Sequence, residues 1–251
     1  MQNLNDYLPQ SVEGKTALVT GGTTGIGRAI AVLLATAGAK VMVFGNRKDH
    51  LEDALADIKK VAKTDAYGYV IDVSHEEEIN LIFKEVDNKL GHLDILVNNV
   101  ATGFSNVTDG TYKDLQYVIN TNLMSYLAFC AGALQRMTPR GEGHIVNIGS
   151  MSADRREPTG SVYVATKAAI QAYSEALRKK VNPDGIKVTL IEPGLVDTDM
   201  QEKPTHEKLQ QVENLEMLTA DDIAIAVLYC LSQPKRCDVV EMKIRPHLQL
   251  I

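Results

Sequence analysis

Short apolar segments that alternate with helical patterns constrain the fold of this chain more than any other feature. Each segment is apolar throughout instead of at alternate residues, which is typical of strands that are buried on both faces of a sheet. A helical stretch separates each segment from the next, as parallel neighbouring strands require. We therefore expect an α/β fold with a parallel sheet covered by helices on both faces. The expected strands are 15–20, 40–44, 66–71, 93–97, 144–148 and 187–191, with 238–244 as a candidate for a seventh.

The expected helices carry recognisable start and stop signals. Ser74 followed by Glu77 has the spacing of a capping box. Thr219 is a second candidate N-cap, with acidic residues behind it that suit the helix dipole. Gly38 ends the first helix, as glycine commonly does. The expected helices cover 28–37, 49–62, 75–90, 112–137, 163–181 and 220–231.

Composition narrows the class of protein. The 251 residues are 45% hydrophobic and 23% charged, which is ordinary for a globular protein and fits one domain over 1–251. A net charge of −6 argues against a nucleic-acid partner, and no apolar run approaches the ~18 residues that cross a membrane. The cysteines at 130, 230 and 237 lack metal-ligand spacing, so we expect no metal site and reduced thiols in the cytoplasm. Residues 1–14 lack a signal-peptide pattern and are expected to form a surface arm.

A glycine-rich turn joins the first strand to the first helix. A dinucleotide pyrophosphate binds in this position, on the amino end of the helix. Gly21 would permit the turn, Gly25 would let the backbone approach the phosphates, and Gly27 would let helix and strand pack closely. The spacing is G-x-x-x-G-x-G, and a purely structural turn is the alternative interpretation.

The end of the second strand bears on which nucleotide would bind. An acidic residue there would bind ribose hydroxyls, whereas a basic one would suit a 2′-phosphate. The residues are Gly45-Asn46-Arg47-Lys48, with no acid. This favours NADP(H), with Arg47 as the first candidate for the phosphate and Lys48 as the second. The alternatives are that Arg47 begins a solvated helix and that the cofactor is NAD(H).

Two further strand ends carry candidate site residues. Asp72 and Val73 end the third strand and could contact adenine, while a helix-capping role for Asp72 is the alternative. Later in the chain, Tyr163 and Lys167 lie four residues apart, on one helix face. A Lys ammonium lowers the pKa of a nearby phenol from about 10 toward values suited to proton transfer. Ser150 would then bind the oxygen that gains or loses the proton, although the Tyr–Lys spacing alone also arises by chance.

Taken together and in this order, the motifs resemble the short-chain dehydrogenase/reductase family over essentially the whole chain. The matching segments are TGGTTGIG at 20–27, DV at 72–73, NNVA at 98–101, Asn122, Ser150, Tyr163-x-x-x-Lys167 and PGLVDT at 193–198.

The resemblance implies a single-domain Rossmann fold with a seven-stranded parallel sheet and hydride transfer at the strand ends. Tyr163 would be the general acid in reduction and the base in oxidation, and Lys167 would lower its pKa and bind the nicotinamide ribose. Ser150 would bind the substrate oxygen, and Asn122 would hold Lys167 through a water; a role for Asn122 in satisfying a kinked helix is compatible with this. The implied cofactor-binding residues are Gly21, Thr23, Thr24, Gly25, Ile26, Gly27, Asn46, Arg47, Lys48, Asp72, Val73, Asn99, Tyr163, Lys167, Pro193, Gly194, Val196 and Thr198.

The resemblance also bears on substrate and assembly. Thr24 and Asn46 stand where NADP-preferring members often carry basic residues, so NAD(H) stays open. Residues 195–218 would form a substrate lid, and their polar composition favours a small polar carbonyl or alcohol. The chain ending resembles carbonyl reductases and 3-hydroxy acid dehydrogenases, with a 3-oxoacyl-type reductase as the alternative. Family members imply a homotetramer around the helices at 112–137 and 161–181, with residues 247–251 packed into a neighbouring subunit.

Overall fold

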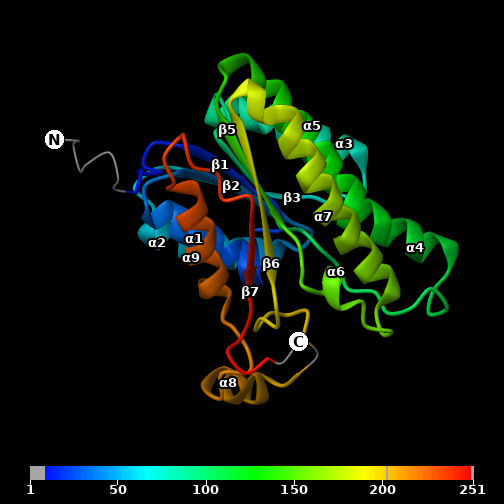
Figure 1. Cartoon of the computed structure of the whole chain (residues 1–251). Helices are drawn as coiled ribbons and strands as arrows, with labels where there is room; N and C mark the ends of the chain where they lie inside the picture. The colour runs from blue at the N-terminus through cyan, green and yellow to red at the C-terminus, as the bar shows by residue number, and fades with distance from the viewer. Residues whose placement is uncertain (1–8, 202, 250–251) are drawn as a thin grey trace.

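A seven-stranded parallel sheet forms the centre of the computed structural model, which describes residues 9–201 and 203–249 (Figure 1). The strand order is β3-β2-β1-β4-β5-β6-β7, so the chain starts in the middle, runs to one edge, and returns to build the other half. The expected α/β fold is therefore confirmed, including the seventh strand. The strands are β1 (Thr16–Val19), β2 (Lys40–Gly45), β3 (Ala66–Val70), β4 (Ile95–Asn98), β5 (Gly143–Ile148), β6 (Ile186–Pro193) and β7 (Glu241–Ile244).

Helices cover both faces of this sheet, as the uniformly apolar strands predict. In Figure 1, α1, α2 and α9 lie on one face and α3, α5 and α7 on the other. Each face has its own apolar cluster, one centred on α1 and α9 and the other on α5. The helices are α1 (Gly25–Thr36), α2 (Lys48–Val61), α3 (Glu76–Glu85), α4 (Tyr112–Ile119), α5 (Ser125–Met137), α6 (Ser152–Arg155), α7 (Ser161–Val181), α8 (Thr205–Glu213) and α9 (Ala220–Leu231).

Helix starts and interruptions differ from expectation in informative ways. The N-cap expected at Thr219 is confirmed, and in the structure Asp222 completes a capping box with it. The one expected at Ser74 is wrong: α3 begins after His75, which makes no side-chain cap. Instead, the Asp72 carboxylate accepts the Ser74 N–H at 2.9 Å. Ser74 therefore belongs to the turn before α3. The expected helix over 112–137 is interrupted by a π-helical turn, η3 (Asn120–Met124).

The first residues of the described chain are better packed than a surface arm. Residues 1–8 of the expected arm lie outside the described part of the chain. Beyond them, Val12 is buried among the apolar residues of α1 and α9, and the Gln10 N–H donates to the Ser232 carbonyl at 2.7 Å. Within the described residues, none of the helices has the length and apolar character needed to cross a membrane.

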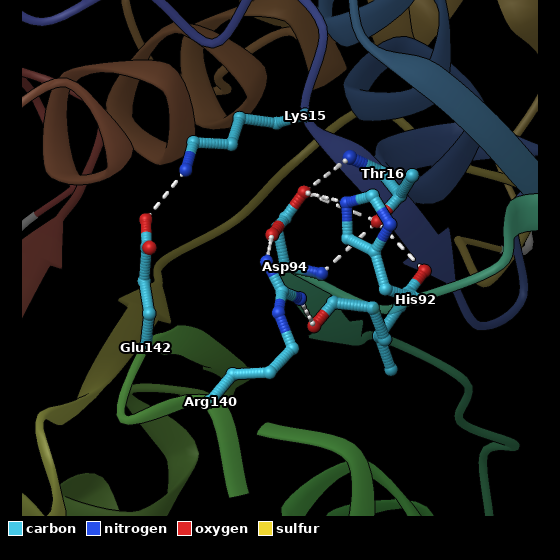
Figure 2. A network of polar contacts seen from close by, with 7 residues as sticks. Lys15, Thr16, His92, Asp94, Arg140 and Glu142 are labelled. Carbon is cyan, nitrogen blue, oxygen red and sulfur yellow. Dashed lines mark hydrogen bonds and ion pairs between the residues drawn. The ribbon is translucent and has the colours of Figure 1, made fainter. Parts of the chain in front are cut away.

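A buried carboxylate holds together the amino ends of the central strands (Figure 2). Asp94, just before β4, accepts the Thr16 N–H at 2.8 Å and the Arg140 guanidinium at 2.8 Å, and its carboxylate lies 3.1 Å from His92 Nε2. Burial alone would raise the pKa of Asp94, but the bonds from Thr16 and Arg140 hold it below its ordinary value. Asp94 is therefore charged at neutral pH and ties β1 and β4 to the 3-10 turn that follows α5.

We expect Asp94→Asn to destabilise the protein by about 2 kcal/mol, because one acceptor oxygen is lost and buried donors are left unpaired. The matched control is Glu142→Gln, which removes only the exposed ion pair with Lys15 and should cost no more than about 1 kcal/mol. Urea unfolding measures both changes. The lowered Asp94 pKa means that its contribution is lost as the pH falls below about 4, so the difference between wild type and Asp94→Asn should narrow there. Equal stability of the two proteins at pH 7 would contradict this role.

Candidate functional site

A cleft of about 1200 Å³ runs along the carboxyl ends of the strands and brings most of the expected site residues together. Parallel strands all end at this edge, which is why loops far apart in sequence meet there. Among the expected site residues, Gly27, Arg47, Lys48 and Asn122 do not line the cleft. Those that line it are Gly21, Thr23, Thr24, Gly25, Ile26, Asn46, Asp72, Val73, Asn99, Ser150, Tyr163, Lys167, Pro193, Gly194, Val196 and Thr198.

The glycine-rich turn forms one end of the cleft. Gly21 and Gly25 have φ of +60° and +48°, a left-handed conformation that side chains disfavour. A Cβ on Gly27 would lie 2.2 Å from the Gly21 carbonyl oxygen, so α1 can only pack this closely on a glycine. Helix α1 begins at Gly25 with no acidic residue in its first turn. This amino end is therefore suited to bind the phosphates of a dinucleotide.

Thr20 fixes the shape of this turn, and the sequence interpretation did not assign it a role. Its hydroxyl accepts the N–H groups of Asn99 and Val100 at 2.8 and 3.1 Å. In return, the Asn99 side chain donates to the carbonyls of Thr20 and Gly21. These bonds join the ends of β1 and β4 and hold Asn99 at the cleft wall. The only sequence signal was the position of Thr20 at the start of the matching segment TGGTTGIG.

At the end of β2, the side chains of Arg47 and Lys48 pair with acidic residues of α2 and do not line the cleft. Arg47 makes two contacts with the carboxylate of Asp49, its Nε donating at 3.2 Å and its Nη2 at 2.5 Å. Both side chains are more than half exposed, so this pair is weak and a stronger anion can displace it. Lys48 lies 3.6 Å from Glu52 on the same helix. Asn46 lines the cleft itself, as do Asp72 and Val73 of the loop after β3.

Ser150, Tyr163 and Lys167 converge where the loop after β5 meets α7. Lys167 is buried, and its ammonium donates to the Ile148 carbonyl at 2.9 Å. Burial lowers the pKa of Lys167 to about 8, with Glu192 acting in the opposite direction, so the amine stays mainly protonated at pH 7. Its Nζ is 5.7 Å from the centre of the Tyr163 ring. The cluster therefore places a buried cation beside a phenol and a second hydroxyl.

The pKa of Tyr163 differs from the expectation that Lys167 would lower it. Burial raises the pKa of this phenol above its ordinary value, while a hydrogen bond with Ser150 lowers it. The physical reason is that burial is the largest effect on this phenol, while the Lys167 ammonium is bound to the Ile148 carbonyl and lies 5.7 Å from the centre of the Tyr163 ring. Tyr163 is therefore protonated at neutral pH, the form in which it can donate a proton.

Asn122 lies behind the cleft, in the π-helical turn η3. Its side chain both donates to the Thr102 carbonyl and accepts the Thr102 N–H, each at 2.8 Å. It thereby fixes the loop after β4, which lines the cleft. π-Helical turns inside α-helices are frequent at functional sites. The fully buried Tyr126, in the first turn of α5, donates at 3.0 Å to the same Ile148 carbonyl that binds Lys167.

The loop after β6 and the end of the chain close the other side of the cleft. Lys208 of α8 is buried against this loop, 2.7 Å from the Asp197 carboxylate and 3.2 Å from the Thr198 carbonyl. Gln249 also lines the cleft, and its side chain accepts the Leu195 N–H at 3.1 Å. Neither contact was anticipated: the expected lid lacked an anchor, and residues 247–251 were expected to pack on another subunit. Residues 250 and 251 lie outside the described part.

Comparison with known proteins identifies relatives of the whole chain. The family model described as short chain dehydrogenase matches residues 15–209. An uncharacterized oxidoreductase of Staphylococcus aureus (strain MRSA252) is 36% identical over 235 residues, covering 92% of this chain and 97% of the relative. Another, from Staphylococcus epidermidis (strain ATCC 35984), is 35% identical over 236 residues, covering 94% and 98%.

Solved structures share the fold. L-Sorbose reductase from Gluconobacter frateurii, complexed with NADPH and L-sorbose, matches with a TM-score of 0.86 at 24% identity, covering 96% of this chain and 99% of its own. A short chain dehydrogenase from Burkholderia cenocepacia J2315, in complex with NADP, matches with a TM-score of 0.82 at 29% identity, covering 94% and 98%.

Replacing Asn122 by Ala should destabilise the protein by about 2 kcal/mol, because both backbone groups of Thr102 lose their partner. Urea unfolding tests the stability, and hydrogen exchange should become faster in residues 102–105. Asn120→Ala is the matched control in the same turn, since Asn120 makes a single bond of 3.4 Å to the Ser74 carbonyl. Unchanged exchange in 102–105 would show that Asn122 does not hold this loop.

Proposed function

The chain belongs to the short-chain dehydrogenase family, and on that premise we propose that it transfers a hydride between NADP(H) and a small polar carbonyl or alcohol, with Tyr163 as the general acid and base. The observation that supports this most directly is the cleft itself. It joins the glycine-rich turn at one end to Ser150, Tyr163 and Lys167 at the other. A site for a dinucleotide and a proton donor therefore belong to one continuous space.

In this proposal Ser150, Tyr163 and Lys167 each have a separate part in the reaction. When bound, NADPH supplies a hydride to the carbonyl carbon of the substrate. The hydroxyls of Ser150 and Tyr163 donate hydrogen bonds to the carbonyl oxygen, where negative charge grows. Tyr163 then gives its proton to that oxygen, and the positive charge of Lys167 stabilises the tyrosinate that remains. In the oxidative direction the same tyrosinate takes the proton back.

NADP(H) is supported by the charge at the end of β2. Arg47 and Lys48 supply two cations there, and Arg47 already holds a carboxylate in the two-contact geometry that a guanidinium uses for phosphate. The related Burkholderia protein of known structure was solved with NADP. For this chain, NAD(H) remains the second candidate, because Asp49 competes for the same guanidinium.

The proposed substrate is small and polar because of what surrounds Ser150 and Tyr163. Uncharged polar side chains supply much of the lining outside the glycine-rich turn, together with Met and Phe side chains and the charged Arg155 and Asp199. Lys208 of α8 binds Asp197 of the loop after β6. We propose residues 195–218 as the lid. The polar side chains of the wall are Thr102, Ser105, Ser152, Thr159, Gln201 and Gln249.

We also infer a homotetramer in the cytoplasm. Large apolar side chains are exposed along α4 and η3, including Tyr112 and Met124, at 80% and 53% of their surface, which suits a buried subunit contact. The three cysteines are free thiols, as is usual in a reducing compartment.

Tyr163→Phe should lower the turnover number by about 10²–10⁴-fold, because the proton donor is lost, while NADPH binding persists. Stopped-flow turnover and the quenching of NADPH fluorescence measure the two effects separately. Tyr173→Phe is the matched control on the same helix, since its hydroxyl bonds with Cys130 away from the cleft. Near-normal turnover by Tyr163→Phe with an accepted carbonyl substrate would rule out this mechanism.

The cofactor preference is tested by dissociation constants for NADPH and NADH measured side by side. We expect Arg47→Ala to weaken NADPH binding by about tenfold or more, the loss of one charge-assisted pair, and to leave NADH binding unchanged. Asp49→Asn should tighten NADPH binding, because it frees the Arg47 guanidinium. Lys48→Ala should have the smaller effect, as Lys48 pairs along its own helix. Tighter binding of NADH than of NADPH by the wild type would favour NAD(H).

A further inference from the structure

A buried glutamate lies directly beneath the loop that carries Ser150. Glu192 of β6 has no solvent-exposed surface. Its side chain occupies the space that Gly149 leaves open: a Cβ on Gly149 would lie 3.2 Å from the Glu192 Cγ and 3.4 Å from its Oε1. Gly149 lines the cleft and directly precedes Ser150. The carboxyl group is therefore separated from the reaction space by one glycine.

The same face of α7 contacts both Glu192 and the backbone at Ile148. Lys167 and Gln171 lie one helical turn apart on α7, so they present neighbouring side chains to the sheet. The Lys167 ammonium reaches the Ile148 carbonyl at 2.9 Å, and the Gln171 amide lies 3.5 Å from Glu192 Oε2. Lys167 thus binds Ile148, the last residue of β5, and the Glu192 side chain lies beside the next residue, Gly149.

Charged groups face Glu192 from three elements. From β7, Lys243 lies 3.6 Å from Glu192 Oε2 and 3.2 Å from Glu241. From α6, Asp154 shares the Lys243 ammonium and accepts a bond from Gln171. From α7, the nearby cation is Lys167. Lys243 is therefore divided among three carboxylates and compensates Glu192 only in part.

One oxygen of this carboxyl group is unsatisfied. Within the described residues, Glu192 Oε1 is buried and has no hydrogen-bond partner. Leaving a buried charge without a partner is costly, and such groups are kept where they serve a function more often than elsewhere. On the cleft side of Glu192, the available positive charge is Lys167. Among the contacts of the described residues, Lys167 also has no carboxylate within ion-pair distance.

We propose that Glu192 is a positioning residue that acts through Lys167: its carboxylate is the buried counter-charge that keeps Lys167 protonated and so keeps Tyr163 competent for proton transfer. The inference rests on the proposed function of Tyr163 and Lys167. Glu192 itself touches neither substrate nor cofactor.

The titration order of the pair fits this role. Burial raises the pKa of Glu192 to about 7, while Lys243 opposes the rise. Burial lowers the pKa of Lys167 to about 8, and Glu192 opposes that fall. As the pH rises, Glu192 therefore becomes negative just before Lys167 would lose its proton. The negative charge then holds the proton on Lys167 over the range in which it would otherwise leave.

The test is the pKa of Lys167 in the unliganded protein, followed by NMR of ¹³C,¹⁵N-labelled lysine and assigned by the loss of its signal in Lys167→Arg. In Glu192→Gln we expect this pKa to fall by about one unit, the shift typical of losing a nearby opposite charge. The alkaline limb of the turnover profile for carbonyl reduction should move to lower pH by the same amount, with turnover near its maximum kept. A merely structural role would lower turnover at every pH and leave the limb in place.

Two further variants make the assignment specific. Lys243→Gln should also lower the Lys167 pKa, because Lys243 favours the ionised form of Glu192. Glu241→Gln is the matched control: Glu241 opposes ionisation of Glu192, so its removal should leave the Lys167 pKa unchanged or raise it.

An unchanged Lys167 pKa in either Glu192→Gln or Lys243→Gln, with the native circular dichroism spectrum, would overturn the proposal, as would an equal fall in Glu241→Gln. Because the NMR titration needs neither cofactor nor substrate, it stands apart from the proposed function. Failure of the protein to bind NADPH would count against that function alone.

Discussion

Parallel alignment of the strands is the constraint on which everything else in this structure depends. It brings the carboxyl ends of the strands to one edge, so the turns after β1, β2 and β3 meet the loops after β4, β5 and β6 there. Residues as distant in sequence as Gly21 and Thr198 consequently line one cleft. The same alignment gathers the amino ends at the opposite edge, where Asp94 closes a separate polar network. The cleft and the Asp94 network therefore lie at opposite ends of the strands.

The fold was largely predictable because it follows from patterns that are local in sequence. Uniformly apolar segments separated by helical ones predict buried parallel strands, and the structure has each of them. The Thr219 cap was predictable for the same reason, since its partner lies three residues away. At Ser74 the same local pattern failed because two candidate caps competed: the Asp72 carboxylate binds the Ser74 N–H, and the helix starts later.

The finer geometry of the site depends on contacts that sequence spacing does not encode. The Tyr–Lys spacing predicts that the two side chains share a helix face, but not that the Ile148 carbonyl binds the Lys167 ammonium. Arg47 was identified as a basic residue at the right strand end, yet its pairing with Asp49 depends on rotamers of exposed side chains. Thr20, Lys208 and Gln249 were missed because each acts through a partner distant in sequence: Asn99, Asp197 and Leu195.

The buried charged groups at the two ends of the strands differ in how fully their hydrogen-bond partners compensate them. Asp94 is surrounded by donors that satisfy its carboxylate, so its charge stabilises the fold. Lys167 and Glu192 have fewer partners, and burial shifts the pKa of each toward neutrality. Groups whose two protonation states are close in free energy can exchange protons at physiological pH, whereas a fully satisfied carboxylate cannot. Incomplete compensation near Ser150 therefore costs stability, which the Asp94 network and the two apolar layers offset, and it would make the proposed proton transfer at Tyr163 accessible.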